Sequence, residues 1–203
     1  LLNGMDYRET IRKKFNLRLI VGSIGSLEVF INKTGEAIHK SKSKPIIELA
    51  TSEAQINKKM ILINNLLNEI GINSTIRKNE EDVIWRKLAR LTVISTITSM
   101  YDSSIGFART NNESKKTMLK IIDEVCLINA KIGNQINPED ISKNINSLPY
   151  DLKTSMQRDI ILNKDSEIDY ILKAPLKFGE KLGLNLPVMN HCYEVLSQKI
   201  RAK

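Results

Sequence analysis

The feature that most constrains the fold is a change in the spacing of apolar residues near Ser52. Before it, the segments 17–31 and 44–52 are short runs rich in β-branched residues, separated by the polar, glycine-containing segment 32–43. Such runs predict two or three strands joined by tight turns. After Ser52, apolar residues recur every three or four positions, which is the spacing of amphipathic helices. The sequence therefore predicts a β-rich beginning followed by a helical domain.

The expected elements follow from this spacing and from residues that begin or end helices. Asn3-Gly4 predicts a turn before a short helix. Gly71 and Gly133 are suited to the position just after a helix, and Asn137-Pro138 is suited to a helix start. We expect a strand at 72–78 and helices at the following positions: 52–70, 82–99 with an extension toward Ala108, 112–132, 137–146, two between 154 and 183, and one from 187 onward.

Composition excludes several classes of protein. Apolar residues make up 41% and charged residues 27% of the 203, an ordinary balance for a soluble globular chain, and no apolar run approaches a membrane span of roughly 20 residues. The net charge of +8 is dispersed and only 5% of residues are aromatic, which argues against a nucleic-acid partner. An anionic small ligand, such as a phosphorylated cofactor, accounts for the charge equally well.

Cysteine and histidine positions offer no metal site. Cys126 and Cys192 lie far apart outside any CxxC pair, and His39 and His191 complete no zinc spacing. We expect both thiols to be small buried groups in a reduced, cytoplasmic protein. The chain starts with "LLNGMDYRE" and has no initiator methionine. We therefore expect a piece of a longer protein.

Lys87 stands in an unusual place on the predicted helix 82–99. At about 100° per residue, Val83, Leu91, Ile94 and Thr98 project on the same side as this lysine. An amphipathic helix normally places a lysine opposite such a stripe. A sheltered ammonium group is a candidate general acid or anion hook. The alternative is a lysine whose stem crosses the apolar face and whose amine reaches water.

Two polar residues open the short helices predicted between 154 and 171. Ser155 begins the first and Glu167 begins the second. One interpretation is helix capping, which both residue types support. The other is a site at the two helix starts. The fragment "VGSIGS" (21–26) holds only G-x-x-G and is weak evidence for phosphate binding.

These segments together resemble the ketopantoate reductases (2-dehydropantoate 2-reductases). "WRKLARLTVISTITS" is similar to the family's W-x-K-L-x-x-N-x-x-x-N, and "TSMQRDIILNKDSEIDYI" to its S-S-M-x-Q-D…T-E-I-D stretch, with the same Ser-to-Glu spacing. "LLNGMD" resembles its L-x-N-G-x segment, and "LGLNLPVMNHCYEVL" resembles its closing G-x-x-x-P…L segment. The resemblance covers nearly the whole chain, in order.

The resemblance implies a mainly α fold. Residues 1–78 would be the C-terminal remnant of an NADP-binding Rossmann-type domain. Residues 79–203 would be a helical substrate-binding domain like the C-terminal region of 6-phosphogluconate dehydrogenase. The full-length protein would be an NADPH-dependent reductase of a 2-oxo acid, most directly ketopantoate on the route to pantothenate and coenzyme A. This chain lacks the glycine-rich cofactor motif, so the fragment alone is expected to be inactive and to need the N-terminal Rossmann half, with a homodimer as a further expected assembly.

The resemblance also assigns roles to individual residues. Lys87 would be the general acid, Ser155 and Ser95 would bind the substrate, and Glu167 would contact the cofactor ribose. Asn3 would lie between nicotinamide and substrate.

The chain departs from the family at Leu91 and Ser95, where the family has asparagines, and at Arg158, where the family has a glutamine. These departures leave the substrate open. Leu91 and Ser95 favour the alternative of a non-catalytic helical dimerisation or interaction module derived from the same family.

Overall fold

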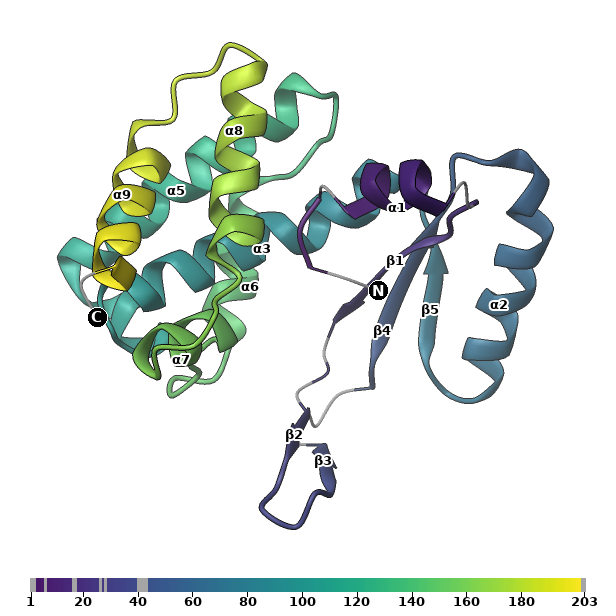
Figure 1. Cartoon of the computed structure of the whole chain (residues 1–203), viewed down its shortest axis with the longest axis horizontal. Coiled ribbons are helices and arrows are strands. Elements are labelled where there is room, and N and C mark those ends of the chain that lie inside the picture. The colour runs from purple at the N-terminus through teal and green to yellow at the C-terminus, as the bar shows by residue number, and fades with distance from the viewer. Residues whose placement is uncertain are drawn as a thin grey trace. The chain divides into compact units, whose positions relative to one another are not determined.

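The computed structural model describes residues 3–5, 7–15, 18–25, 27, 29–39 and 44–201. The chain divides into two compact units, Leu1–Lys87 and Leu88–Lys203, each with its own core (Figure 1). The division falls inside a long helix, whereas the sequence placed the domain boundary before that helix, at residue 78. Helices predominate, and a small sheet lies near the beginning of the chain, so the predicted mainly α fold with a β-rich beginning is confirmed.

The first unit contains the sheet and two helices and ends in the first turns of a third. Its elements are α1 (Tyr7–Phe15), β1 (Val21–Gly25), β2 (Val29–Ile31), β3 (Ala37–His39), β4 (Ile46–Ala50), the 3₁₀ turn η1 (Ala54–Ile56), α2 (Asn57–Glu69), β5 (Asn73–Ile76) and the beginning of α3 (Glu80–Met100). Strand order is β1-β4-β5, antiparallel between β1 and β4 and parallel between β4 and β5, and β2 pairs with β3 in a separate hairpin.

Helix α2 covers one face of the three-stranded sheet (Figure 1). Met60 from the helix packs with Ile47 and Leu49 from β4, and all three are buried. The helix ends at Glu69, and Gly71, two residues later, has a φ of 85° that suits glycine and returns the chain into β5. The α-helix followed by a parallel strand is the crossover unit that doubly wound folds repeat.

The buried carboxylate of Glu80 joins three segments of this unit. It accepts hydrogen bonds from Arg12 at 2.7 Å and from Arg8 at 3.3 Å, both on α1. The backbone amide and hydroxyl of Ser52, just after β4, donate to it at 3.0 and 3.1 Å. Glu80 is also the first residue of α3, so this cluster fixes where α3 begins.

The second unit is a helical bundle around α5. It contains the rest of α3, followed by α4 (Ile105–Thr110), α5 (Asn112–Lys131), α6 (Pro138–Ser147), α7 (Ser155–Ile161), the π-helical segment η2 (Asp169–Lys173), α8 (Ala174–Lys181) and α9 (Pro187–Arg201). Helix α5 buries residues at three- and four-residue spacing, and it contacts α4, α6, α8 and α9. The sequence periodicity predicted this arrangement of an amphipathic helix facing a core.

Glu124 on α5 caps the last helix. Its two carboxylate oxygens accept hydrogen bonds from the amides of Val188 and Met189, at 2.8 and 2.7 Å. These amides belong to the first turn of α9, where backbone donors have no partner within the helix. Pro187 occupies the first position, which needs no donor. One buried side chain thus docks α9 onto α5.

The predicted extension of α3 toward Ala108 is wrong. The helix ends at Met100, and the chain turns through Asp102, whose φ is 46°. A new helix, α4, then begins with Ser104 as its N-cap, which accepts a hydrogen bond from the amide of Phe107. The apolar spacing continues across the break because both helices face the same core, and spacing alone therefore cannot locate the turn.

Candidate functional site

Helix α3 carries three of the residues that the sequence singled out. Lys87, Leu91 and Ser95 follow one another at four-residue intervals, so they lie along one line of the helix surface. Lys87 and Leu91 are half-buried, whereas Ser95 is only 1% exposed. Lys87 is the last residue of the first unit, and Leu91 and Ser95 belong to the second.

The hydroxyl of Ser95 is a buried polar group without a hydrogen-bond partner in the described part of the chain. The neighbouring hydroxyls of Thr96 and Ser99 share this condition. Buried polar groups in proteins are normally paired with protein or with ordered water. Ser95 and Ser99 lie one turn apart on the same side of α3, so their unpaired hydroxyls mark a place where water or a ligand can supply the missing partners, whereas Thr96 projects about 100° away from Ser95.

Ser155 is the first residue of α7, and its side chain is exposed. The residue before it, Thr154, is the N-cap, because its hydroxyl accepts a hydrogen bond from the amide of Gln157 at 3.3 Å. The capping interpretation of Ser155 therefore applies to its neighbour instead. The Thr154 hydroxyl also lies 3.0 Å from the hydroxyl of Thr98, which ties the start of α7 to α3.

Glu167 lies in the turn that leads into η2, and its side chain is half-buried. Its carbonyl accepts hydrogen bonds from the amides of Tyr170 and Ile171, at 3.0 and 2.9 Å. The carbonyl of Ile171 in turn accepts a hydrogen bond from Thr92 on α3, at 2.7 Å. A second hydroxyl of α3 thus holds the segment that carries Glu167.

Within the second unit, α3 is therefore bonded to both segments that the sequence marked. Thr98 holds the start of α7 beside Ser155, and Thr92 holds the η2 segment beside Glu167. Sequence reasoning assigned no role in the site to Thr92, Thr98 or Thr154. The only signal for Thr92 and Thr98 was the run of Ser and Thr within the otherwise apolar part of helix 82–99, and Thr154 had no signal beyond its place before a predicted helix start.

Asn3 belongs to the first unit, in the bend before α1, and is half-buried. The predicted turn is present, and Gly4 adopts a φ of 87°, which glycine accommodates without strain. Gly22 and Gly25, from the G-x-x-G fragment, lie in strand β1 and pair with Leu49 and Ile46. They form an extended ladder rather than a strand-to-helix phosphate loop.

Neither cysteine has the chemistry of a nucleophile. Burial, together with the charge of Asp123, raises the pKa of Cys126 to about 11, and burial together with Glu124 raises that of Cys192 to about 12. Both thiols are free and stay protonated near neutral pH. Among the described residues, no three His, Cys, Asp or Glu side chains are grouped to hold a metal ion. No described helix has the length and apolarity to cross a membrane.

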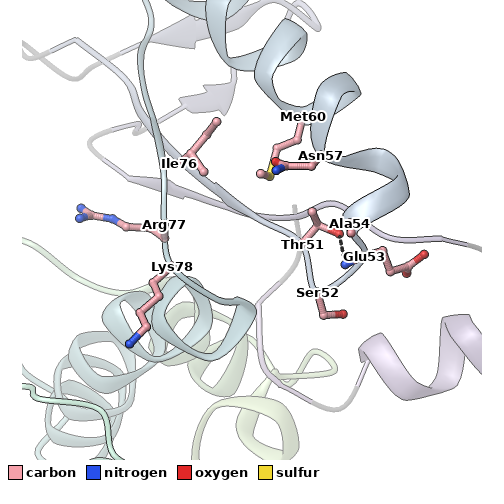
Figure 2. Close-up of a pocket in the computed structure, with 9 residues that line it drawn as sticks. All are labelled: Thr51, Ser52, Glu53, Ala54, Asn57, Met60, Ile76, Arg77 and Lys78. Atoms are coloured by element: carbon pink, nitrogen blue, oxygen red, sulfur yellow. Dashed lines mark hydrogen bonds between the residues drawn. The ribbon is translucent and has the colours of Figure 1, made fainter.

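The first unit also has an open pocket of about 350 Å³ where β5 ends and α2 begins. Figure 2 shows Asn57 and Met60 of α2 on one side of it and Ile76 of β5 opposite, with the side chains of Arg77 and Lys78 directed away from the helix. The lining mixes both signs of charge and contains none of the residues predicted for the site, so we do not assign it a ligand.

Comparison with known proteins identifies a family. The model of the "Ketopantoate reductase PanE/ApbA C terminal" family matches residues 79–200, more than half of the chain. A 2-dehydropantoate 2-reductase of Streptococcus pyogenes is 25% identical over 205 residues, covering 98% of this chain. The chain spans only 66% of the length of that relative.

Solved structures share the fold at lower identity. D-mandelate dehydrogenase in complex with NADH and anilino(oxo)acetate superposes with a TM-score of 0.86 at 20% identity, covering 100% of this chain and 67% of that one. A dimeric ketopantoate reductase from Staphylococcus aureus gives a TM-score of 0.81 at 18% identity, covering 98% of this chain and 66% of that one.

Proposed function

The chain belongs to the PanE/ApbA ketopantoate reductase C-terminal family, and from that membership we propose that the full-length protein reduces a 2-oxo acid with a nicotinamide cofactor. The observation that carries the proposal is the pair of hydroxyl bonds from α3, at Thr92 and Thr98, to the two segments that bear Glu167 and Ser155. These are the segments whose spacing matches the family pattern.

The residues of this chain suit the chemistry of such a reduction. When hydride from the cofactor reaches the carbonyl carbon, negative charge develops on the oxygen, and a cationic donor can stabilise and protonate it. In our proposal the ammonium of Lys87 is that donor. The exposed hydroxyl of Ser155 and the unpaired buried hydroxyl of Ser95 bind the oxo acid.

The candidate site residues of this chain suit only the ribose part of the cofactor. The half-buried carboxylate of Glu167 suits a pair of ribose hydroxyls, but the described residues include no glycine-rich turn between a strand and a helix. We propose that the pyrophosphate is held by an N-terminal Rossmann half, which the family resemblance implies for the full-length protein. NADPH is the cofactor that the family resemblance implies. The complex of the related D-mandelate dehydrogenase contains NADH, so a direct comparison of the two cofactors belongs in the first assay.

The replacement of two family asparagines by Leu91 and Ser95 favours a substrate less polar than ketopantoate. Leucine offers no hydrogen bond and serine offers a short one. The ligand named with D-mandelate dehydrogenase, anilino(oxo)acetate, is an oxo acid with an aromatic substituent. We propose a 2-oxo acid with an apolar side chain as the substrate, and a homodimer as in the Staphylococcus aureus relative.

Replacing Lys87 by alanine in the full-length protein tests the mechanism. We expect kcat to fall by about 100-fold or more, the usual scale for general acid–base catalysis, with little change in melting temperature. Arg86→Ala is the matched control, because Arg86 is an exposed cation on the same helix whose described ion pair is with Asp82, one turn earlier. Normal turnover in Lys87→Ala would remove Lys87 from the mechanism.

A non-catalytic interaction module is the second candidate. The observation that favours it is an exposed apolar stripe along α2 and its C-cap residue, where Leu62, Leu66 and Ile70 are 59%, 50% and 73% exposed. A full-length protein that binds neither cofactor nor any 2-oxo acid, yet forms a stable dimer, would support this candidate and exclude the reductase.

A further inference from the structure

The hydroxyl bonds of α3 have a defined direction. Thr98 donates its single proton to the carbonyl of Ile94, at 2.8 Å in the preceding turn. The bond between Thr98 and Thr154 must then run from the Thr154 hydroxyl to the Thr98 oxygen. The Thr154 oxygen still accepts from the amide of Gln157. The Thr154 hydroxyl therefore donates its proton to Thr98 on α3 and accepts the amide hydrogen of Gln157 on its own helix.

This chain of bonds fixes the first turn of α7. Thr98 and Thr154 are both buried, so neither hydroxyl can exchange its partner for bulk water. Ser155 is the next residue and points outward. The place of Ser155 at the start of α7 thus depends on a bond that its neighbour makes to α3.

The η2 segment is held in a different way. In a regular α-helix, the carbonyl of Ile171 would accept the amide hydrogen of residue 175, but Pro175 has none. The chain widens into a π-helical turn here, in which the amide of Ala174 reaches back to the carbonyl of Asp169. Thr92 donates to the Ile171 carbonyl in place of the proline. The amide of Ile171 meanwhile closes the turn on the carbonyl of Glu167.

We infer that Thr92 and Thr98 are positioning residues with separate targets: Thr98 sets the place of Ser155 through Thr154, and Thr92 sets the place of Glu167 through Ile171. The inference rests on the proposed function, in which Ser155 binds the oxo acid and Glu167 binds the cofactor. It deepens that function because it assigns a separate residue of α3 to the positioning of each ligand-binding residue.

Thr96 provides an internal control on the same helix. It is as buried as Thr92 and Thr98, but its hydroxyl has no partner in the described part of the chain. Valine has nearly the shape of threonine, so Thr96→Val removes only an unpaired polar group and should leave both ligands unaffected. Thr92→Val and Thr98→Val remove paired hydroxyls, and the corresponding serine variants restore them.

Hydrogen exchange on the full-length protein tests the supports without any assay of activity. Thr98→Val should speed hydrogen exchange of the Gln157 amide, and Thr92→Val should speed hydrogen exchange of the Ile171 amide. We expect an increase of about fivefold or more in each rate, because a hydrogen bond contributes about 1 kcal/mol. Each serine variant should return to the wild-type rate. Unchanged exchange at both amides would overturn the inference whatever the protein binds.

Ligand measurements on the same variants test the separation of targets. Thr98→Val should raise the KM for the 2-oxo acid by about fivefold or more and leave the calorimetric Kd of NADPH or NADH unchanged. Thr92→Val should raise the calorimetric Kd of the cofactor by about fivefold or more and leave the KM for the 2-oxo acid unchanged. Equal changes in both constants would indicate a purely structural role and overturn the inference. Absence of any turnover or cofactor binding in the wild type would instead contradict the proposed function, and the exchange rates would still decide the two supports.

Discussion

Gly106 shows how a single missing methyl group shapes the second unit. A Cβ atom at this position would lie 2.2 Å from the ring of Tyr150 and 2.5 Å from its carbonyl oxygen. The Gly106 amide donates to that same carbonyl at 2.9 Å. The loop before α7 can therefore approach α4 only because residue 106 has no side chain.

We predict that Gly106→Ala destabilises the protein by about 1–3 kcal/mol, the usual range for overpacking. Alanine would otherwise favour a helix over glycine by about 1 kcal/mol, so the sign of the change separates packing from helix propensity. Gly25→Ala is the control, because a Cβ there meets no atom within 4 Å. Urea unfolding of both variants gives the comparison, and an unchanged or higher midpoint for Gly106→Ala would contradict the close approach.

Sequence reasoning at this scale named Lys87 as a candidate from its place on a helix, and Ser155 and Glu167 from a spacing that matches a family pattern; these roles stay predictions. It could not assign a role to Thr92 or Thr98. A hydroxyl on a helix bonds to its own preceding turn unless another segment offers a partner, and that partner is set by tertiary packing. The proton of Thr98 does go to its own helix, and only its lone pair reaches α7.

Helix ends were predictable where glycine marks them. Gly71, Gly133 and Gly183 adopt φ values of 85°, 76° and 77° just past α2, α5 and α8. The end of α3 was not predictable in this way, because the turn uses Asp102, and non-glycine residues with positive φ are uncommon. The π-helical turn before Pro175 was missed for a related reason. A proline usually indicates a helix end, but here the helix widens and continues.

The start of α3 should make the first unit sensitive to acid. Burial by itself would raise the pKa of Glu80, but hydrogen bonds from Arg12 and from the amide of Ser52 outweigh it and hold the pKa below the ordinary value of 4.5. A lowered pKa means that the unfolded chain takes up the proton first. The stabilisation is therefore complete above about pH 4.5 and is lost as pH falls further, through the pKa of the folded state.

We predict that melting temperature measured from pH 7 to pH 3 falls more steeply below about pH 4.5 in the wild type than in Glu80→Gln. The variant should also melt lower at pH 7, since glutamine cannot reproduce the charge opposite Arg8 and Arg12. Glu139→Gln is the control, because that carboxylate is exposed on α6. If melting temperature fell with pH to the same extent in wild type and in Glu80→Gln, the charge of Glu80 would contribute nothing to stability.

The whole chain combines two kinds of sequence signal. The change from strand to helix spacing predicted the general architecture, because burial of apolar residues decides it. The order of the family motifs indicated which larger protein the chain resembles, and the family match over residues 79–200 confirms that identification. The chain spans only 66% of the length of the Streptococcus pyogenes relative, so the activity of the full-length protein stays a proposal.

Substrate preference belongs to this scale, because in the proposed function it is a property of the full-length protein. Leu91 lies one turn after Lys87 and one turn before the unpaired hydroxyl of Ser95. If the asparagine of the family donates to the substrate there, leucine leaves one polar group of ketopantoate without a partner. Such a loss costs roughly 1–3 kcal/mol, or about one to two decades in affinity.

We therefore predict that the full-length protein uses ketopantoate poorly and that 2-oxo acids lacking its hydroxyl compete well. Leu91→Asn should raise kcat/KM for ketopantoate by about tenfold or more and lower it for the apolar acids. Leu119→Asn, at an exposed leucine on α5, is the matched control for the same substitution away from α3. A wild type that prefers ketopantoate by orders of magnitude, with no gain in Leu91→Asn, would mean that residue 91 does not face the substrate. The correspondence between α3 and the family motif would then have to shift, and the role proposed for Lys87 would shift with it, since the two residues are fixed on one helix.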